Sequence, residues 1–152
     1  MSERIPDFSS FWLYYIGEHR NPLCRATHFV GTTGFVSVVG WCIIERPLRM
    51  TIALALGLLV GFLARKVEAR RRAVPELLAL GIIWAVGHPL VYAGILVAYF
   101  FAWVGHYLIE HNRPATFSYP LWSLAGDFKM YGQMLTGRLW SGDASHIAPI
   151  EA

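Results

Sequence analysis

LLALGIIWAVGHPLVYAGILVAYFFAWVGHYLI, residues 77–109, is the stretch that decides the fold. It is apolar almost throughout, and as a single helix it would be about 50 Å long, whereas the hydrocarbon core of a bilayer is about 30 Å thick. We therefore predict a helical hairpin that turns between Gly87 and Gly94. His88-Pro89 and Gly94 are the candidate helix breakers in this interval.

Two further apolar runs precede this stretch, from His28 to Ile44 and from Leu48 to Ala64, and Glu45-Arg46-Pro47 separates them. Asn21 is a good N-cap and Pro22 a good first helical residue, so a helix should begin there. The sequence predicts an all-α integral membrane protein with a bundle of four transmembrane helices in two hairpins. The expected membrane helices are residues 22–45, 48–64, 76–92 and 93–112.

Composition supports a membrane protein of one domain. The chain has 152 residues, of which 55% are hydrophobic and 15% charged, and we expect residues 1–152 to form a single membrane domain. The net charge is +3, and no segment combines clustered basic residues with interspersed aromatic residues, so we expect no nucleic-acid partner. Cys24 and Cys42 do not form a C-x-x-C pair, which disfavours zinc-ribbon and thioredoxin-like proteins.

The basic residues predict the orientation. Arg65, Lys66 and Arg70–Arg72 form the densest basic cluster, and the positive-inside rule places this loop in the cytoplasm. With four crossings, both termini are then cytoplasmic. The membrane would be the bacterial inner membrane, or the endoplasmic reticulum in a eukaryote.

Two amphipathic segments flank the predicted membrane helices. Residues 7–20 place an aromatic-rich stripe on one helix face, which indicates an interfacial helix against the headgroups. Residues 116–140 are aromatic and polar and are expected to form an interfacial C-terminal segment. Residues 141–152 are expected to be a flexible tail.

The histidines carry the functional signal. His19 and His28 flank the start of the first predicted crossing and His106 lies at the end of the last, so all three fall at the cytoplasmic face. Glu110 follows His106 by four residues and would share its helix face, whereas His111 points elsewhere. Ionisable groups at membrane depth are functional candidates, and imidazole with carboxylate suits iron, zinc or copper. The alternative is that these histidines bond only to headgroups or neighbouring helices.

Several motifs together resemble the Mpo1-like family, formerly a domain of unknown function (DUF962). The resemblance covers about residues 8–140. It rests on His19-Arg20-Asn21-Pro22, His28-Phe29-Val30-Gly31-Thr32, Gly105-His106 with Glu110, Asn112-Arg113-Pro114-Ala115-Thr116-Phe117, and Tyr119-Pro120-Leu121-Trp122.

The resemblance implies a multi-pass membrane dioxygenase that uses Fe(II) and O₂ to shorten 2-hydroxy fatty acids by one carbon in α-oxidation. It implies His19, His28, His106 and Glu110 as catalytic metal ligands. It also implies that Arg20, Asn112 and Arg113 bind the substrate, whose acyl chain would lie between the helices. A non-catalytic multi-pass protein and another metal-dependent lipid enzyme, a hydroxylase or a hydrolase, remain alternatives. No feature of the sequence predicts an oligomeric state.

Overall fold

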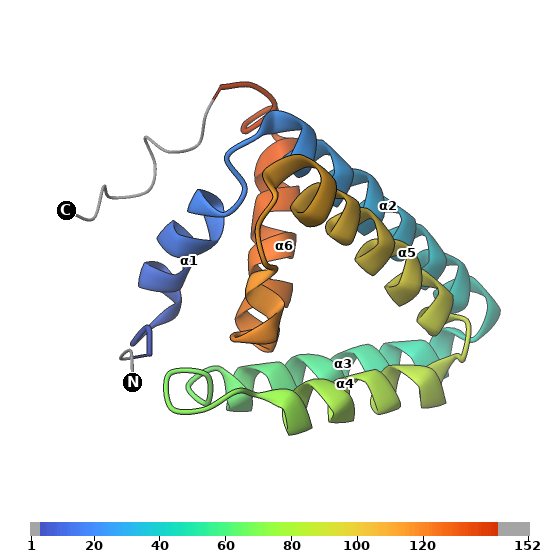
Figure 1. Cartoon of the computed structure of the whole chain (residues 1–152). Helices are drawn as coiled ribbons and strands as arrows, with labels where there is room; N and C mark the ends of the chain where they lie inside the picture. The colour runs from blue at the N-terminus through green and yellow to red at the C-terminus, as the bar shows by residue number, and fades with distance from the viewer. Residues whose placement is uncertain (1–3, 143–152) are drawn as a thin grey trace.

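The computed structural model describes residues 4–142, and over this range the chain is helical without strands (Figure 1). Residues 143–152, most of the segment expected to be a flexible tail, lie outside the described residues. The helices are α1 (Phe8–Gly17), α2 (Pro22–Glu45), α3 (Pro47–Ala64), α4 (Val74–Gly87), α5 (Val91–Trp103), the π-helix η1 (Val104–Glu110), the 3₁₀ turn η2 (Ala115–Phe117) and α6 (Pro120–Leu135).

Local sequence signals explain where α2 begins and ends. The Asn21 side chain accepts a hydrogen bond from the backbone N–H of Leu23, and Pro22 is the first helical residue. At the other end only Arg46 separates α2 from α3, because Pro47 starts the next helix. The chain therefore turns a sharp corner between these two helices.

The predicted break within residues 77–109 is confirmed. The helix α4 ends at Gly87, and α5 begins at Val91 after a short turn. His88 stabilises this turn, because its Nδ1 accepts from the N–H of Leu90 and its Nε2 lies 2.9 Å from a carboxylate oxygen of Glu45. The turn is thus tied to the end of α2.

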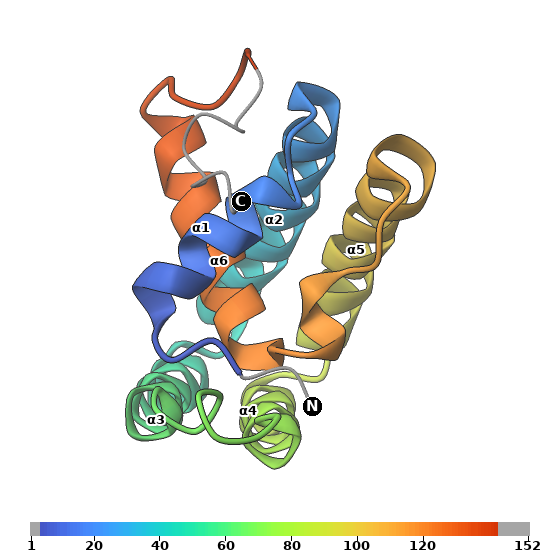
Figure 2. The same ribbon diagram turned by 60° about the vertical axis from the view of Figure 1, so that its left-hand side comes forward.

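The four long helices form two antiparallel pairs, α2 with α5 and α3 with α4. The pairs meet at the end where α2 joins α3 and α4 joins α5, and they diverge toward the other end, where α1 and α6 lie (Figures 1 and 2). We expected the first and last long helices to lie side by side, and the pairing of α2 with α5 confirms this. The predicted hairpins, residues 22–45 with 48–64 and 76–92 with 93–112, are corrected, because successive long helices meet at corners and pack mainly against other partners. The single bundle of four aligned helices is likewise corrected to two diverging pairs, because α6 packs between them.

Three helical segments in the described chain are long and apolar enough to cross a membrane: Pro22–Glu45, Pro47–Ala64 and Val91–Glu110. The helix α4 is apolar but has 14 residues. That length corresponds to about 21 Å, less than the hydrocarbon thickness. The fold is therefore that of an all-helical protein suited to a membrane, with three clear candidate spans and a shorter fourth helix.

The aromatic stripe of α1 is buried against α6 and η2. Phe11 and Tyr15 pack with Trp122, and Met130 and Met134 complete this core. The stripe that suggested contact with headgroups is thus covered by protein. A position of α1 at the membrane interface stays a prediction, and it would involve the opposite face of the helix.

The loop between α3 and α4 anchors the start of α6. The carboxylate of Glu68 is fully buried and accepts hydrogen bonds from the backbone N–H groups of Leu121 and Trp122 at 2.7 and 2.5 Å. The Arg4 side chain donates to the carbonyl of the same glutamate. Because the first N–H groups of a helix have no partner within it, Glu68 fixes where α6 begins.

Candidate metal centre

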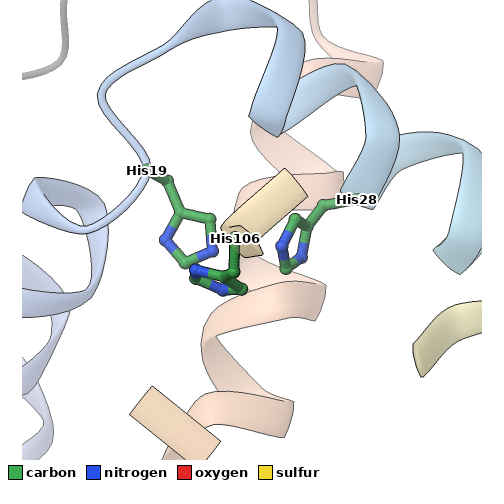
Figure 3. A group of neighbouring side chains, drawn as sticks. All are labelled: His19, His28 and His106. Carbon is green, nitrogen blue, oxygen red and sulfur yellow. The ribbon is translucent and has the colours of Figure 1, made fainter. Parts of the chain in front are cut away.

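Three histidines from three segments converge at the open end of the α2–α5 pair. His19 lies in the link between α1 and α2, His28 in the second turn of α2, and His106 in η1. All three are buried, and one ligand atom from each lies within 4.8 Å of the others (Figure 3). The ring centroids are 4.6 to 5.2 Å apart.

Hydrogen bonds fix the protonation pattern of the three rings. Nδ1 of His19 lies 2.6 Å from the carbonyl oxygen of Tyr15, and Nδ1 of His28 lies 2.7 Å from Oδ1 of Asp127. Nδ1 of His106 lies 2.7 Å from Oδ1 of Asn112. Because each partner is an oxygen acceptor, each Nδ1 carries the proton and each Nε2 presents its lone pair.

The partners of His28 and His106 are themselves held in place. Oδ1 of Asp127 also accepts a hydrogen bond from the Tyr15 hydroxyl at 2.5 Å. The amide nitrogen of Asn112 donates to the backbone carbonyl and to a carboxylate oxygen of Glu18, which turns the amide oxygen toward His106. Burial raises the pKa of the Tyr15 hydroxyl well above its usual range, so this group remains a donor.

The Nε2 lone pairs that face one another fit a metal ion. Nε2 of His19 and Nε2 of His28 are buried without a hydrogen-bond partner, a costly state for polar atoms unless a ligand satisfies them. Burial holds the pKa of His19 well below its ordinary value, and the neighbouring imidazoles lower it further, so the ring stays in the neutral form that binds metals. Three imidazole nitrogens suit iron, zinc or copper and leave coordination positions open.

Close packing of α2 against η1 brings His28 and His106 together. A Cβ atom at Gly105 would lie 2.7 Å from Oγ1 of Thr27 and 2.9 Å from Sγ of Cys24. A larger residue would force the two helices apart, because both neighbouring atoms belong to short side chains of α2 that have little room to move. Gly105 therefore permits the approach that places the next residue, His106, beside His28.

Glu110 does not join the three histidines, contrary to the expectation from its spacing. Its carboxylate accepts a hydrogen bond from the backbone N–H of Asn21 at 2.6 Å. Spacing along η1 does not show which partner a carboxylate reaches, and in the structure Glu110 bonds to the N-cap residue of α2. His111 ends η1 with a left-handed backbone and is exposed, in keeping with its exclusion from the expected site.

The three residues expected to bind substrate occupy different environments. Asn112 orients His106, as described above. Arg20 is exposed and donates to the carbonyl of Gly17. Arg113 is also exposed and lies over the ring of Phe117, 4.9 Å from its centroid. The substrate-binding role of the two arginines stays a prediction.

Arg25 is a structural residue that the sequence analysis missed. Its fully buried guanidinium donates to the carbonyls of His19 and Arg20 and to three carbonyls of the C-terminal segment, those of Leu139, Ser141 and Gly142. It thereby ties residues 139–142 to the link that carries His19. An arginine three residues before His28, near the start of an apolar helix, was the available signal.

Asp127 was also missed, because it lies far along the chain from the histidines. The available signal was a carboxylate within an amphipathic helix, but sequence alone does not show which helices meet. In the structure it joins α6 to α2 through His28. Tyr15 belongs to the aromatic stripe of residues 7–20 that was expected to contact headgroups, and its hydroxyl donates to this carboxylate.

An apolar cavity of about 290 Å³ adjoins the histidines. His28, His106 and Asp127 line it together with side chains of α4, α5 and α6. The candidate metal centre thus faces an apolar space within the protein.

Comparison with known proteins gives one match. Residues 5–139 match the model of a protein family described as "2-hydroxy-palmitic acid dioxygenase Mpo1-like". No curated protein and no solved structure matches the chain. The matched range contains all three histidines and the residues that bond to their Nδ1 atoms.

Proposed function

The chain belongs to the Mpo1-like family, and on that premise we propose that it is a membrane dioxygenase that uses Fe(II) and O₂ to shorten 2-hydroxy fatty acids by one carbon. The family description supports the reaction class and the substrate. The observation that carries the proposal for this chain is the group of three buried histidines whose Nε2 atoms face one another.

His19, His28 and His106 would hold the metal through Nε2. Bound there, Fe(II) would supply O₂ activation and a chelation site for the hydroxyl and carboxylate oxygens of a 2-hydroxy acid. Asp127 and Asn112 orient two of the rings, and the buried Tyr15 hydroxyl holds the carboxylate of Asp127. The apolar walls around the site exclude bulk water from it.

The overall reaction balances without a further reductant. A 2-hydroxy acid and O₂ give the acid shorter by one carbon, carbon dioxide and water, so the electrons released by the substrate reduce O₂ completely. No electron-donor protein is then needed for turnover.

Metal analysis combined with a product assay tests this proposal. Protein purified in detergent should contain iron or bind added Fe(II), and it should convert 2-hydroxypalmitic acid to the odd-chain acid when O₂ is present. His106→Ala should lose both iron and product, whereas His111→Ala, which alters an exposed histidine outside the group, should retain both. Zinc in place of iron, with no chain shortening, would contradict the proposal and favour a hydrolase.

We further propose that α2, α3, α4 and α5 all cross the membrane, with both termini and the histidines at the cytoplasmic face. In support, the basic loop between α3 and α4 lies at the same end of the fold as α1 and α6 (Figure 1). Reporter fusions at Ala152 and at Arg46 test this orientation. A C-terminus on the outside would contradict it.

A further inference from the structure

The lining of the cavity changes in character along its length. Near the histidines it includes polar side chains, among them Thr32, Ser123 and Asp127. Along α5 it continues as a stripe at helical spacing, formed by Trp103, Ala102, Tyr99, Ala98, Ile95 and Tyr92. From Trp103 to Tyr92 this stripe extends about 17 Å. The cavity therefore has a polar end at the metal centre and a long apolar remainder.

The apolar part of the cavity opens sideways between α4 and α5. Leu78 and Ile82 of α4, and Tyr92 and Trp103 of α5, line the cavity and are also largely exposed on the outside of the molecule. On a helix within a bilayer, that outside is lipid. A molecule dissolved in the membrane could thus enter the cavity without passing through water.

We propose that this cavity binds the alkyl chain of the substrate, with the carboxyl and hydroxyl groups at the histidines and the chain extending along α5 toward Tyr92. The inference rests on the proposed function, because that function places the head of a 2-hydroxy acid at the metal centre. The alkyl chain is the occupant that matches the lining, since the space beyond the histidines is bounded by aliphatic and aromatic side chains and is continuous with the site. Its length is close to that of an extended long-chain fatty acid.

Ser123 supplies a hydrogen bond for the head of the substrate. Its Oγ is buried without a partner, its side chain lines the cavity, and the residue is 2% exposed. It precedes Asp127 by four residues on α6, so the two side chains lie on the same helix face. An oxygen of the carboxyl or hydroxyl group would satisfy this hydroxyl, which otherwise carries the cost of an unpaired buried polar group.

Gly81 allows the chain site to be tested directly. It lies on α4 and lines the cavity, and a Cβ atom added there would meet no atom within 4 Å. Gly61 is a matched control, because it lies on the apolar helix α3, is half-buried, and also has open space where a Cβ would stand, but it does not line the cavity. Gly81→Phe should fill the cavity, and Gly61→Phe should not.

The experiment measures binding of radiolabelled 2-hydroxy fatty acids of increasing chain length to the purified protein, without O₂ so that no turnover occurs. We expect Gly81→Phe to lose at least about tenfold in affinity for 2-hydroxypalmitic acid, which corresponds to about 1.4 kcal/mol. Affinity for a short 2-hydroxy acid should stay unchanged, and Gly81→Leu should give a smaller loss. Gly61→Phe should bind every chain length as the unaltered protein does.

Thermal stability and metal content show whether each variant is folded. If folded Gly81→Phe and Gly81→Leu bind long and short acids as the unaltered protein does, the chain lies elsewhere and the inference is wrong. Equal losses for short and long acids would also overturn it. Ser123→Ala should weaken binding by a similar factor at every chain length, because it affects the head of the substrate.

Failure of this inference can be told apart from failure of the proposed function. If the protein binds 2-hydroxy acids with the expected length dependence but forms no shorter acid, the cavity assignment stands and the proposed dioxygenase activity is wrong. If the protein forms the shorter acid but Gly81→Phe leaves its affinity for long acids unchanged, the dioxygenase activity stands and the cavity assignment is wrong.

Discussion

Nδ1 of His28 on α2 lies 2.7 Å from Oδ1 of Asp127 on α6, and the Tyr15 hydroxyl of α1 donates to the same carboxylate oxygen. One carboxylate therefore connects three helices at the candidate metal centre. A carboxylate that accepts from Nδ1 fixes the tautomer of a metal-binding histidine and makes its Nε2 a better ligand. The position of α6 thus bears directly on metal affinity.

Asp127→Asn should lower metal affinity by about 10- to 100-fold, because the neutral amide is a weaker acceptor for Nδ1 of His28 than the carboxylate. Asp127→Ala should lower it further. Iron retained after dialysis against graded concentrations of a chelator measures the effect. Asp7→Asn alters the exposed N-cap of α1 and should leave affinity unchanged. Equal metal retention in Asp127→Asn and the unaltered protein would show that the carboxylate does not support the site.

Glu110→Gln should keep the metal, whereas His106→Ala should lose it, because the Glu110 carboxylate accepts from Asn21 and lies apart from the three rings. The glutamine retains an oxygen acceptor for the Asn21 N–H, so the start of α2 should stay intact. Iron content of the two purified variants decides the matter. Loss of iron from Glu110→Gln, with retention of thermal stability, would restore Glu110 as a ligand.

Arg25→Met should destabilise the protein by about 2–4 kcal/mol, because the carbonyls that the buried guanidinium binds lose charge-assisted hydrogen bonds while the apolar stem is kept. The thermal midpoint in detergent should fall, and proteolysis should cleave more readily near Leu139. Arg70→Met changes an exposed arginine in the loop between α3 and α4 and serves as the control. An unchanged midpoint in Arg25→Met would contradict this role.

Glu68→Gln should destabilise the start of α6 by about 1–2 kcal/mol, because each carboxylate oxygen accepts from one N–H group and glutamine replaces one of these oxygens with an NH₂ group that cannot accept. Thermal unfolding measures the loss. Glu76→Gln removes one partner of an exposed ion pair with Arg71 and should change stability little. If the two variants unfold alike, Glu68 does not anchor α6.

The sequence predicted the features that depend on local signals. Asn21-Pro22 marked the start of α2, and the length of residues 77–109 required a turn, which His88-Pro89 provides. The convergence of His19, His28 and His106 was also predicted, although the expected hairpins were wrong: the last long helix returns along the first because α3 and α4 pair with each other between them. These inferences needed helix lengths and order, both of which apolar runs and prolines determine.

The remaining features depend on contacts that no local pattern encodes. The hydrogen bond between the Glu110 carboxylate and the backbone N–H of Asn21 leaves no mark in the spacing of residues along η1. Asp127 and Arg25 act across 99 and up to 117 residues of chain, so their partners are known only once α6 and the C-terminal segment are placed. The divergence of the helix pairs likewise follows from α6, whose packing was not foreseen.

The three ligands and their supports are synthesised at widely separated times. His28 is made with the first long helix, but His106, Asp127 and the C-terminal carbonyls that Arg25 binds are made only when most of the chain has been synthesised. Until then the first helix carries a charged guanidinium and an incomplete ligand set. The candidate metal centre can therefore be complete only after most of the chain has been made, and a chain that ends before residue 106 lacks one of its three histidines.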